Sequence, residues 1–287
     1  MIARNWLRGL GLALAMLGAA QAHAQGMRGT DTLARIQSEG VIRVGVRDSA
    51  PPFAYYEQGK PAGFSWSVCQ SVVQQLEGEL KRPITIQPVP VSLASSFEML
   101  NDGRIDLQCG STTHTAERAR QVDFSNTFFI SGIVVSYRKD EVRYANPLQF
   151  GRVGVLANST AAAIMTKRAA SKGSSVIDAV VPVGSYDEGI EKLKKKEIDT
   201  LFADGVLVPT DAEISRRSMM ETIEPYALML RKGDHAFREK VDQALSKVLG
   251  SPGIRQMAVN SRLDGKINML TAEVWRRPSR DPAPQLY

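Results

Sequence analysis

The chain has 287 residues, 43% of them hydrophobic, which is enough for two ordinary domains with cores of their own. Its formal charge of +6 is a mild excess spread along the sequence. The one dense basic run, residues 192–196, falls on a predicted helix and is typical of a solvated face. This charge pattern argues against nucleic-acid binding.

The first 24 residues have the organisation of a secretory signal peptide. Arg4 and Arg8 flank the start of an apolar run over residues 7–20, and the segment ends in Ala22-His23-Ala24, an Ala-x-Ala cleavage pattern. The run is shorter than the ~20 residues of a membrane-spanning helix, and no second long apolar segment follows. We expect cleavage after Ala24 (after Ala22 as second choice), a periplasmic location, and a soluble mature chain without membrane insertion. Its formal charge is +4, because two of the arginines that make up +6 are removed.

Strand and helix patterns alternate through the first half of the mature chain. Residues 41–46 have a strand pattern, and residues 65–80 carry apolar side chains at helical spacing. A strand over 84–91, a short helix at 97–100 and a strand over 105–109 follow. This βαβαβ order predicts a parallel sheet with helices on its faces.

The same alternation restarts after Tyr137, which predicts a second α/β lobe. Residues 275–287 contain three prolines and are expected to form a loosely held tail. The expected elements of this half are strands over 152–156, 180–183, 200–203 and 226–230, and helices over 159–170, from Ser185 (with Glu188 placed for a capping box), near 206–216, and from the cap Asp234.

The chain has two cysteines, Cys69 and Cys109. An oxidising compartment permits a disulfide between them, but a bridge needs Cα atoms within about 7 Å, which the sequence does not decide. Cys69 falls on the buried face of a predicted helix and Cys109 at a strand end. We expect two buried thiols rather than a bridge.

Polar side chains follow three predicted strands at their carboxyl ends, where open α/β sheets bind ligands. Arg47 ends the first strand, and Asp204 ends a strand of the second half. The strand ending at Cys109 is followed by Ser111 to Thr113 and then by Arg118, with Thr115 placed to cap the next helix. A fourth group, residues 158–160, leads into a helix whose free N–H groups attract an anion.

This set of side chains suits a zwitterion. Arg118 can hold a carboxylate bidentately, helped by Ser111 and Thr113, and Asp204 can accept from an ammonium. Arg47 is then left for a third, anionic group. Each residue alone also fits a surface role, such as an Arg118–Glu117 ion pair. Together, at the ends of the right strands, they favour a binding cleft.

Two segments resemble the periplasmic polar amino-acid-binding proteins of ABC transporters (bacterial solute-binding protein family 3). They are residues 40–47 (GVIRVGVR), with Pro52-Phe53 and Gly63-Phe64 after them, and residues 109–125 (CGSTTHTAERARQVDFS). The resemblance covers nearly the whole mature chain and is strong to about residue 139. It is nearest to the glutamate/aspartate-binding branch.

The resemblance implies the type II periplasmic-binding-protein fold: two α/β lobes, each a mostly parallel sheet flanked by helices, joined by two hinge strands near 136–139 and 227–231. The implied organisation is signal peptide 1–24, first lobe 25–136 and 228–274, second lobe 137–227, and tail 275–287. The implied partners are a small amino acid and a membrane permease, and the protein is expected to be a monomer without cofactor or metal.

The resemblance also implies roles for single residues. Ser111, Thr113 and Arg118 match contacts to the ligand's α-carboxylate, with Thr160 from the second lobe, and Asp204 matches the contact to the α-ammonium. Arg47 matches a position that is arginine in acidic amino-acid binders, and Tyr186 falls where those proteins place a histidine. One departure is that residues 93–96 read LASS, where acidic binders carry a further arginine. Glutamate or aspartate is the expected ligand, and their amides and other small dicarboxylates stay open.

Two other classes of protein remain as alternatives, a dehydratase- or hydrolase-like enzyme on the same fold and a sensor that reports to a membrane receptor. Against an enzyme, the mature chain keeps only His114 and His235 and has no Gly-x-Ser-x-Gly, His-Glu-x-x-His or Cys-x-x-Cys motif. A sensor would need a separate partner, because no transmembrane helix follows residue 231. We expect a binding protein that is not an enzyme.

Overall fold

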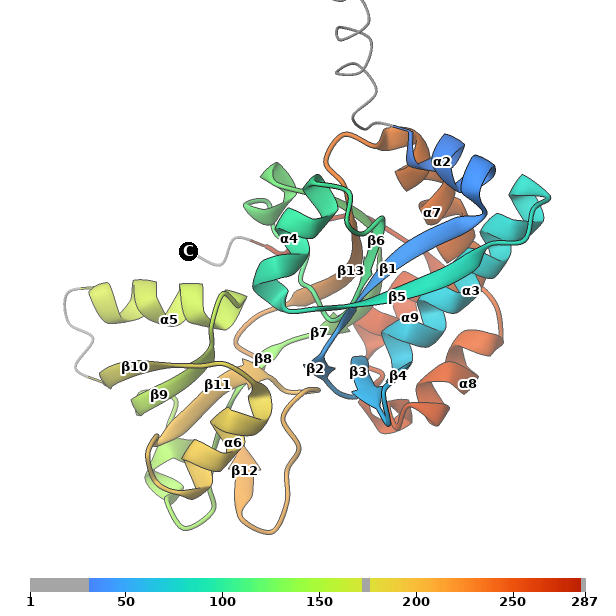
Figure 1. Cartoon of the computed structure of the whole chain (residues 1–287). Helices are drawn as coiled ribbons and strands as arrows, with labels where there is room; N and C mark the ends of the chain where they lie inside the picture. The colour runs from blue at the N-terminus through green and yellow to red at the C-terminus, as the bar shows by residue number, and fades with distance from the viewer. Residues whose placement is uncertain (1–30, 172–175, 285–287) are drawn as a thin grey trace, which may run out of the picture.

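The computed structural model describes residues 31–171 and 176–284, so the predicted signal peptide lies outside the described residues. Two five-stranded sheets form two lobes (Figure 1). In the first sheet the strand order is β5 (Thr85–Val91), β1 (Val41–Arg47), β6 (Leu107–Cys109), β13 (Glu224–Leu230) and β7 (Asp123–Ser131). In the second sheet it is β10 (Ile177–Val183), β9 (Gly151–Leu156), β11 (Thr200–Asp204), β8 (Ile133–Arg138) and β12 (Ile214–Arg216).

The two sheets share one pattern of strand directions. In the first, β5, β1 and β6 pair in parallel, β13 runs antiparallel to β6, and β7 runs antiparallel to β13. In the second, β10, β9 and β11 are parallel, and β8 is the reversed strand between β11 and β12. Each sheet is therefore mostly parallel, as expected, and the carboxyl ends of its first three strands lie at one edge.

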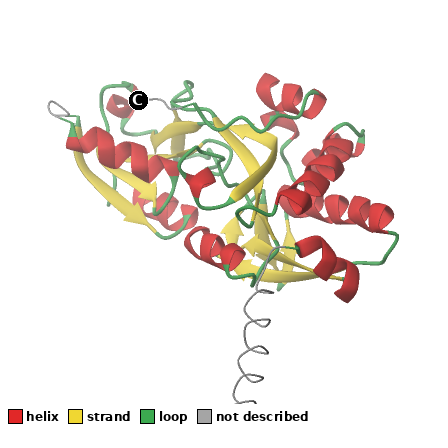
Figure 2. Ribbon diagram, turned by 90° about the horizontal axis from the view of Figure 1, so that it is seen from above, coloured by secondary structure: helices red, strands yellow, loops and turns green. Residues whose placement is uncertain are grey.

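Helices cover both faces of the first sheet (Figure 2). Helix α3 (Phe64–Leu80) packs with α7 (His235–Leu249) on one face, where Val68, Val72 and Leu76 are fully buried. Helix α4 (Leu93–Asn101) joins the core on the other face, and its N-terminus is fixed by a capping box between Ser92 and Ser95. The remaining elements of this lobe are α2 (Thr32–Glu39), α8 (Gly253–Asn260), α9 (Met269–Arg276), the turns η1 (Arg118–Arg120) and η3 (Asp264–Lys266), and the small sheet β2 (Ser49–Ala50), β3 (Ala54–Glu57) and β4 (Lys60–Ala62).

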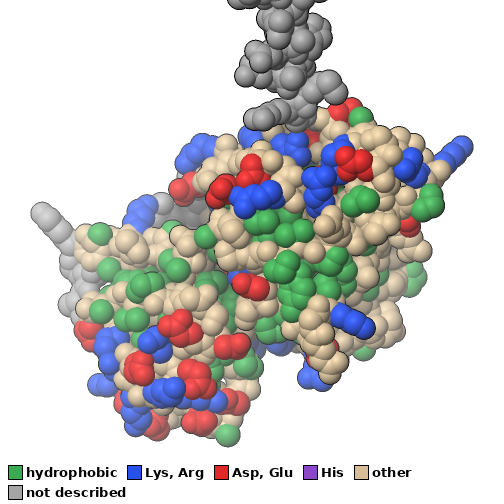
Figure 3. All heavy atoms as spheres, in the orientation of Figure 1, with side chains coloured by type: hydrophobic (Ala, Val, Ile, Leu, Met, Phe, Trp, Pro, Cys, Tyr) green, Lys and Arg blue, Asp and Glu red, His purple; other side chains and the backbone are tan. Residues whose placement is uncertain are grey.

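The second lobe buries both faces of its sheet against α5 (Thr160–Ala170) and α6 (Tyr186–Lys194), and it also holds η2 (Val142–Ala145). Successive residues of β11 point to opposite faces, so Phe202 joins the core with α5 and Leu201 joins the core with α6. The lysines of the basic run 192–196 pair with acidic side chains, and Figure 3 shows acidic and basic side chains mixed on the surface of the second lobe. Lys192 pairs with Glu197 and Lys194 with Asp211, which agrees with a solvated face.

The chain crosses between the sheets at Gly132, between β7 and β8, and again over residues 217–223, between β12 and β13. The expected hinge positions, 136–139 and 227–231, lie a few residues C-terminal to these crossings. Residues 133–136 already pair with β11 or β12 of the second sheet, and Glu224 already pairs with Ser131 of the first. At the first crossing the apolar pattern runs on from Phe128 to Val135, so it does not mark where the chain changes sheet.

The helix expected near 206–216 is wrong, because turns and the strand β12 occupy this segment. Pro209 has no N–H to donate within a helix. The Asp211 carboxylate accepts hydrogen bonds from the backbone N–H groups of Glu213 and Ile214, both at 2.8 Å, which forms an Asx-type turn. This turn directs Ile214 into pairing with Arg138 of β8.

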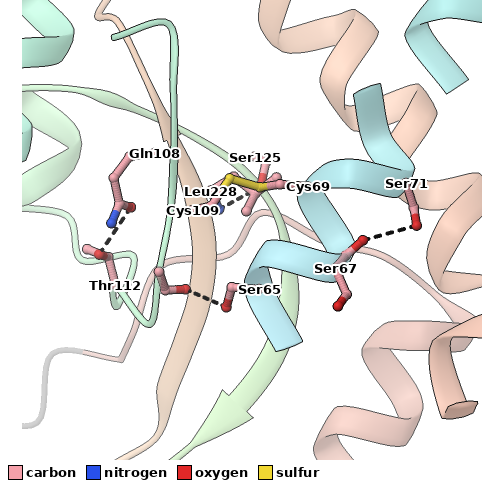
Figure 4. The surroundings of a disulfide bond; sticks show 10 residues. Ser65, Ser67, Cys69, Ser71, Gln108, Cys109, Thr112, Ser125 and Leu228 are labelled. Carbon is pink, nitrogen blue, oxygen red and sulfur yellow. Dashed lines mark hydrogen bonds between the residues drawn. A yellow bond between two sulfur atoms is a disulfide. The ribbon is translucent and has the colours of Figure 1, made fainter. Parts of the chain in front are cut away.

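The expectation of two free thiols is also wrong, because Cys69 and Cys109 form a disulfide with a Cα–Cα distance of 6.4 Å (Figure 4). Helix α3 packs over the carboxyl end of β6, which brings the two cysteines together from 40 residues apart. Ser65 of the same helix donates to the carbonyl oxygen of Gly110 at 2.9 Å. The bridge and this hydrogen bond both hold the start of the polar loop that follows β6.

The described part of the tail, residues 275–284, is not loosely held. Trp275 is 4% exposed, and its indole N–H donates to the carbonyl oxygen of Phe128 at 2.8 Å. Beyond the helix, the Thr127 N–H donates to Ser279 and the Ala283 N–H donates to His114, both at 2.7 Å. The prolines have no N–H to donate, but the carbonyl of Ser279 and the N–H of Ala283 still pair with the first lobe. The segment therefore docks on that lobe as extended chain.

Candidate functional site

The first lobe contributes Arg47 and the loop after β6. Parallel pairing of Val46 with Cys109 places Arg47 beside Gly110. A Cβ atom at position 110 would lie 2.7 Å from Cγ of Arg47, so glycine is needed for the arginine side chain to cross this loop. Arg47 is 5% exposed and Ser111 is 9% exposed. The strand ends thus bring a guanidinium and a hydroxyl into one buried place.

Arg118 contacts both lobes. Thr115 accepts from its backbone N–H at 3.1 Å, as the sequence predicted. Its guanidinium donates from Nη1 to the carbonyl oxygen of Thr113 at 3.0 Å and from Nη2 to that of Asn158 in the second lobe at 3.1 Å. Burial lowers the pKa of Arg118, and the carboxylates of Glu224 and then Asp204 oppose that shift.

The second lobe contributes Thr160, Tyr186 and Asp204. Thr160 and Tyr186 begin α5 and α6, and Asp204 ends β11, so all three lie at the carboxyl edge of the second sheet. Ser159 caps α5 by accepting from the N–H of Ala162. Ser185 caps α6 by accepting from the N–H of Glu188. The Glu188 carboxylate accepts from the N–H of Gly184, one residue away from the predicted capping-box contact.

Glu224, which the sequence analysis did not single out, connects the site residues of the first lobe with those of the second. It is 2% exposed at the first position of β13. The hydroxyl of Thr113 from the first lobe donates to its Oε2 at 2.6 Å, and the hydroxyl of Thr160 from the second lobe donates to the same oxygen at 2.9 Å. The signal available in the sequence was an acidic residue directly before Pro225 and a fully apolar strand.

The electrostatics tie these residues into one site. Burial, and next the Glu224 carboxylate, raise the pKa of Asp204 to about 7. Burial and then Asp204 raise the pKa of Tyr186, and they act in the same order on Tyr226. Both tyrosines therefore stay neutral and serve as hydrogen-bonding groups. All seven residues singled out in the sequence lie at this junction between the lobes: Arg47, Ser111, Thr113, Arg118, Thr160, Tyr186 and Asp204.

Some buried polar atoms of this junction have no hydrogen-bond partner within the described part of the chain. A buried polar group without a partner costs about 1–3 kcal/mol of stability, so such atoms are rare unless a ligand or water meets them. Here they are Nε of Arg47 and Oγ of Ser111. Guanidinium, carboxylate and hydroxyl groups together fit a small molecule that carries both charges.

A hollow of about 560 Å³ lies at the docked tail, apart from this junction. His114, Asp123 and Lys232 are among its lining residues. Burial lowers the pKa of His114 to about 4, and Asp123 is already paired with Lys232 and Arg238. The charges of this hollow are thus largely satisfied internally.

The described residues contain no cluster of three or more His, Cys, Asp or Glu side chains that would hold a metal ion. Within the same part of the chain, no helix combines the length and hydropathy that crossing a bilayer requires.

Comparison with known proteins agrees with this architecture. Residues 42–259 match the model of the bacterial extracellular solute-binding proteins, family 3. The glutamate/aspartate import solute-binding protein of Escherichia coli is 28% identical over 249 residues, which are 83% of this chain and 82% of that protein. The glutamine-binding protein of Geobacillus stearothermophilus is 28% identical over 207 residues, 70% of this chain and 76% of that protein.

A solved structure shows the same fold. The substrate-binding protein of an ABC uptake transporter from Streptococcus pneumoniae, with bound histidine, has a TM-score of 0.70 at 21% identity. The likeness covers 81% of this chain and 96% of that chain. The expected two-lobed type II periplasmic-binding-protein fold is therefore confirmed.

Proposed function

The chain belongs to the bacterial extracellular solute-binding proteins, family 3, and we propose that it is the periplasmic component of an ABC importer that binds a polar amino acid between its lobes. One observation carries the proposal. Arg47 and Arg118 from the first lobe face Asp204 from the second, and the described residues form no ion pair among these three groups. This arrangement is complementary to a zwitterion with one additional polar group.

The proposed contacts follow from charge. Arg118 binds the α-carboxylate together with Ser111, and Asp204 accepts from the α-ammonium. Arg47 faces the ligand side chain, which favours glutamate or aspartate, and the names of the Escherichia coli and Pseudomonas aeruginosa relatives support the same ligands. The hydroxyls of Thr113 and Thr160 donate to Glu224, so they reach the ligand only if those hydrogen bonds are exchanged.

The proposed cycle uses the two chain crossings as hinges. The ligand binds the first lobe through Arg118, and closure of the second lobe brings Thr160, Tyr186 and Asp204 to it. The closed monomer then docks on a membrane permease. Closure is a shift of population that depends on the ligand's higher affinity for the closed form.

The test is calorimetric titration of the mature chain, unfolded and refolded to remove any ligand, against the twenty amino acids and small dicarboxylates at pH 6.5. We expect glutamate or aspartate to bind about tenfold more tightly than glutamine or asparagine, since a charge-assisted bond to Arg47 adds about 1–2 kcal/mol. Absence of binding for every amino acid would reject the proposal. Sustained turnover of a candidate substrate would favour an enzyme instead.

A further inference from the structure

Glu224 is a second carboxylate in the site, beside Asp204. The proposed contacts to a zwitterion do not use it. The side chain is buried where the chain re-enters the first lobe. Hydroxyl donors from both lobes hold it there. A carboxylate fixed from both lobes keeps its place when the lobes are together.

The charged groups of the junction balance one another in number. Arg47 and Arg118 carry two positive charges, and Asp204 and Glu224 carry two negative charges when ionised. Within the described residues, neither arginine lies within ion-pair distance of a carboxylate. The other titratable groups that act on these side chains, Tyr186 and Tyr226, are neutral because burial raises the pKa of both.

This balance has opposite consequences for acidic and neutral ligands. Glutamine or asparagine is a neutral zwitterion and leaves the buried site without net charge. Glutamate or aspartate adds one net negative charge, because it brings two carboxylates and a single ammonium to a site that already buries two carboxylates. A buried charge without a counterpart is strongly unfavourable, and neighbouring carboxylates then retain a proton.

Resting on the proposed function, we propose that Glu224 is a specificity-determining residue, which makes the site bind an acidic amino acid together with one proton and a neutral amide without one. The proton offsets the added charge at the junction where the carboxyl groups of Asp204 and Glu224 are both buried. Thr113 and Thr160 both donate to Oε2 of Glu224, so a proton on Oε1 leaves both hydrogen bonds intact. The raised pKa of Asp204, about 7, means that such a proton is taken up near neutral pH.

The test counts protons directly, by titrating glutamate and glutamine into the unmodified mature protein at pH 8 in two buffers of different ionisation enthalpy. We expect about one proton taken up per glutamate and about none per glutamine. The glutamate Kd is expected to rise about tenfold between pH 7.5 and 8.5, while the glutamine Kd stays constant. Tight glutamate binding without proton uptake would overturn the proposal.

The variant Glu224→Gln tests where the proton is held. It distinguishes the Asp204 and Glu224 carboxyl groups from the side-chain carboxylate of the ligand. It should bind glutamate about tenfold more tightly than the parent at pH 8.5, without proton uptake. The matched control is Glu117→Gln, an exposed carboxylate next to Arg118, which should keep the uptake of the parent. Proton uptake that persists in Glu224→Gln, or loss of all binding in a folded Glu224→Gln protein, would contradict the assignment. If the unmodified protein binds no amino acid at any pH, the proposed function itself fails.

Discussion

Arg118 in the first lobe donates a hydrogen bond from Nη2 to the backbone carbonyl oxygen of Asn158 in the second lobe, at 3.1 Å. Asn158 has a positive φ of 61° in the turn that leads into α5. The arginine proposed to hold the ligand's α-carboxylate is therefore also a direct contact between the lobes. Loss of this side chain affects both ligand binding and closure.

Arg118→Ala should weaken ligand binding at least about hundredfold, because it removes the main counter-charge of a buried carboxylate. Calorimetry with the tightest amino acid measures the effect. Arg120→Ala, an exposed arginine in the same turn, is the control and should bind as the parent does. Unchanged affinity in Arg118→Ala would remove this residue from the site.

Arg47→Met should lower glutamate affinity about ten- to hundredfold at pH 6.5 and glutamine affinity less than about threefold. Methionine keeps much of the packing volume beside Gly110, so the change reports on charge. The measurement is the ratio of the two dissociation constants. Equal losses for both ligands would mean that Arg47 does not read the side chain.

Replacing both cysteines by alanine should lower the free energy of unfolding by about 4 kcal/mol, because the bridge closes a loop of 40 residues in the unfolded chain. Urea unfolding of the oxidised parent and the double variant gives the difference. A reducing agent should destabilise the parent and leave the variant unchanged. Equal stability of the two oxidised proteins would argue against the bridge.

Trp275→Ala should lower the free energy of unfolding by about 3–5 kcal/mol, since the buried indole fills the core and donates to Phe128. Met269 begins the same helix and is 87% exposed, so Met269→Ala should change stability by less than about 0.5 kcal/mol. Similar small effects for both variants would restore the picture of a loosely held C-terminal segment.

His114 should make folding sensitive to acid. Burial lowers its pKa to about 4 in the folded protein, against an ordinary value of 6.5, and the ring stacks on Phe124. The unfolded state therefore binds the extra proton between these pH values. The stabilisation from neutral His114 is complete above pH 6.5 and is lost as the pH falls toward 4.

Urea unfolding at pH 7 and pH 4 measures this effect. The stability difference between the parent and His114→Gln should change by about 3 kcal/mol across that range, because 2.5 pKa units correspond to about that free energy. His235→Gln is the control, since His235 is 69% exposed, and it should follow the parent. A constant difference between parent and His114→Gln would show that His114 does not couple to folding.

The alternation of strands and helices and the polar residues at strand ends were readable from the sequence, because both are local. A parallel strand must end at the same edge as its neighbours. Arg47 and Ser111 follow strands of the first sheet and therefore had to lie at the same edge of that sheet. Asp204 ends a strand of the second sheet and had to lie at the corresponding edge there. The signature over residues 109–125 identified the same loop and its arginine. Sequence spacing was enough to place these residues, because the regular geometry of a strand or helix fixes where each of its residues lies.

Glu224, the disulfide and the docked tail were decided by the tertiary structure alone. Glu224 meets Thr113 from 111 residues away and Thr160 from 64 residues away, and no local pattern encodes such a meeting. Whether Cys69 reaches Cys109 depends on how α3 lies over β6, and whether Trp275 is buried depends on how α9 packs on β7. The sequence by itself determined which groups are available to the site. The packing of distant segments decided how many charges are buried there together, because burial and charge balance are properties of the assembled junction.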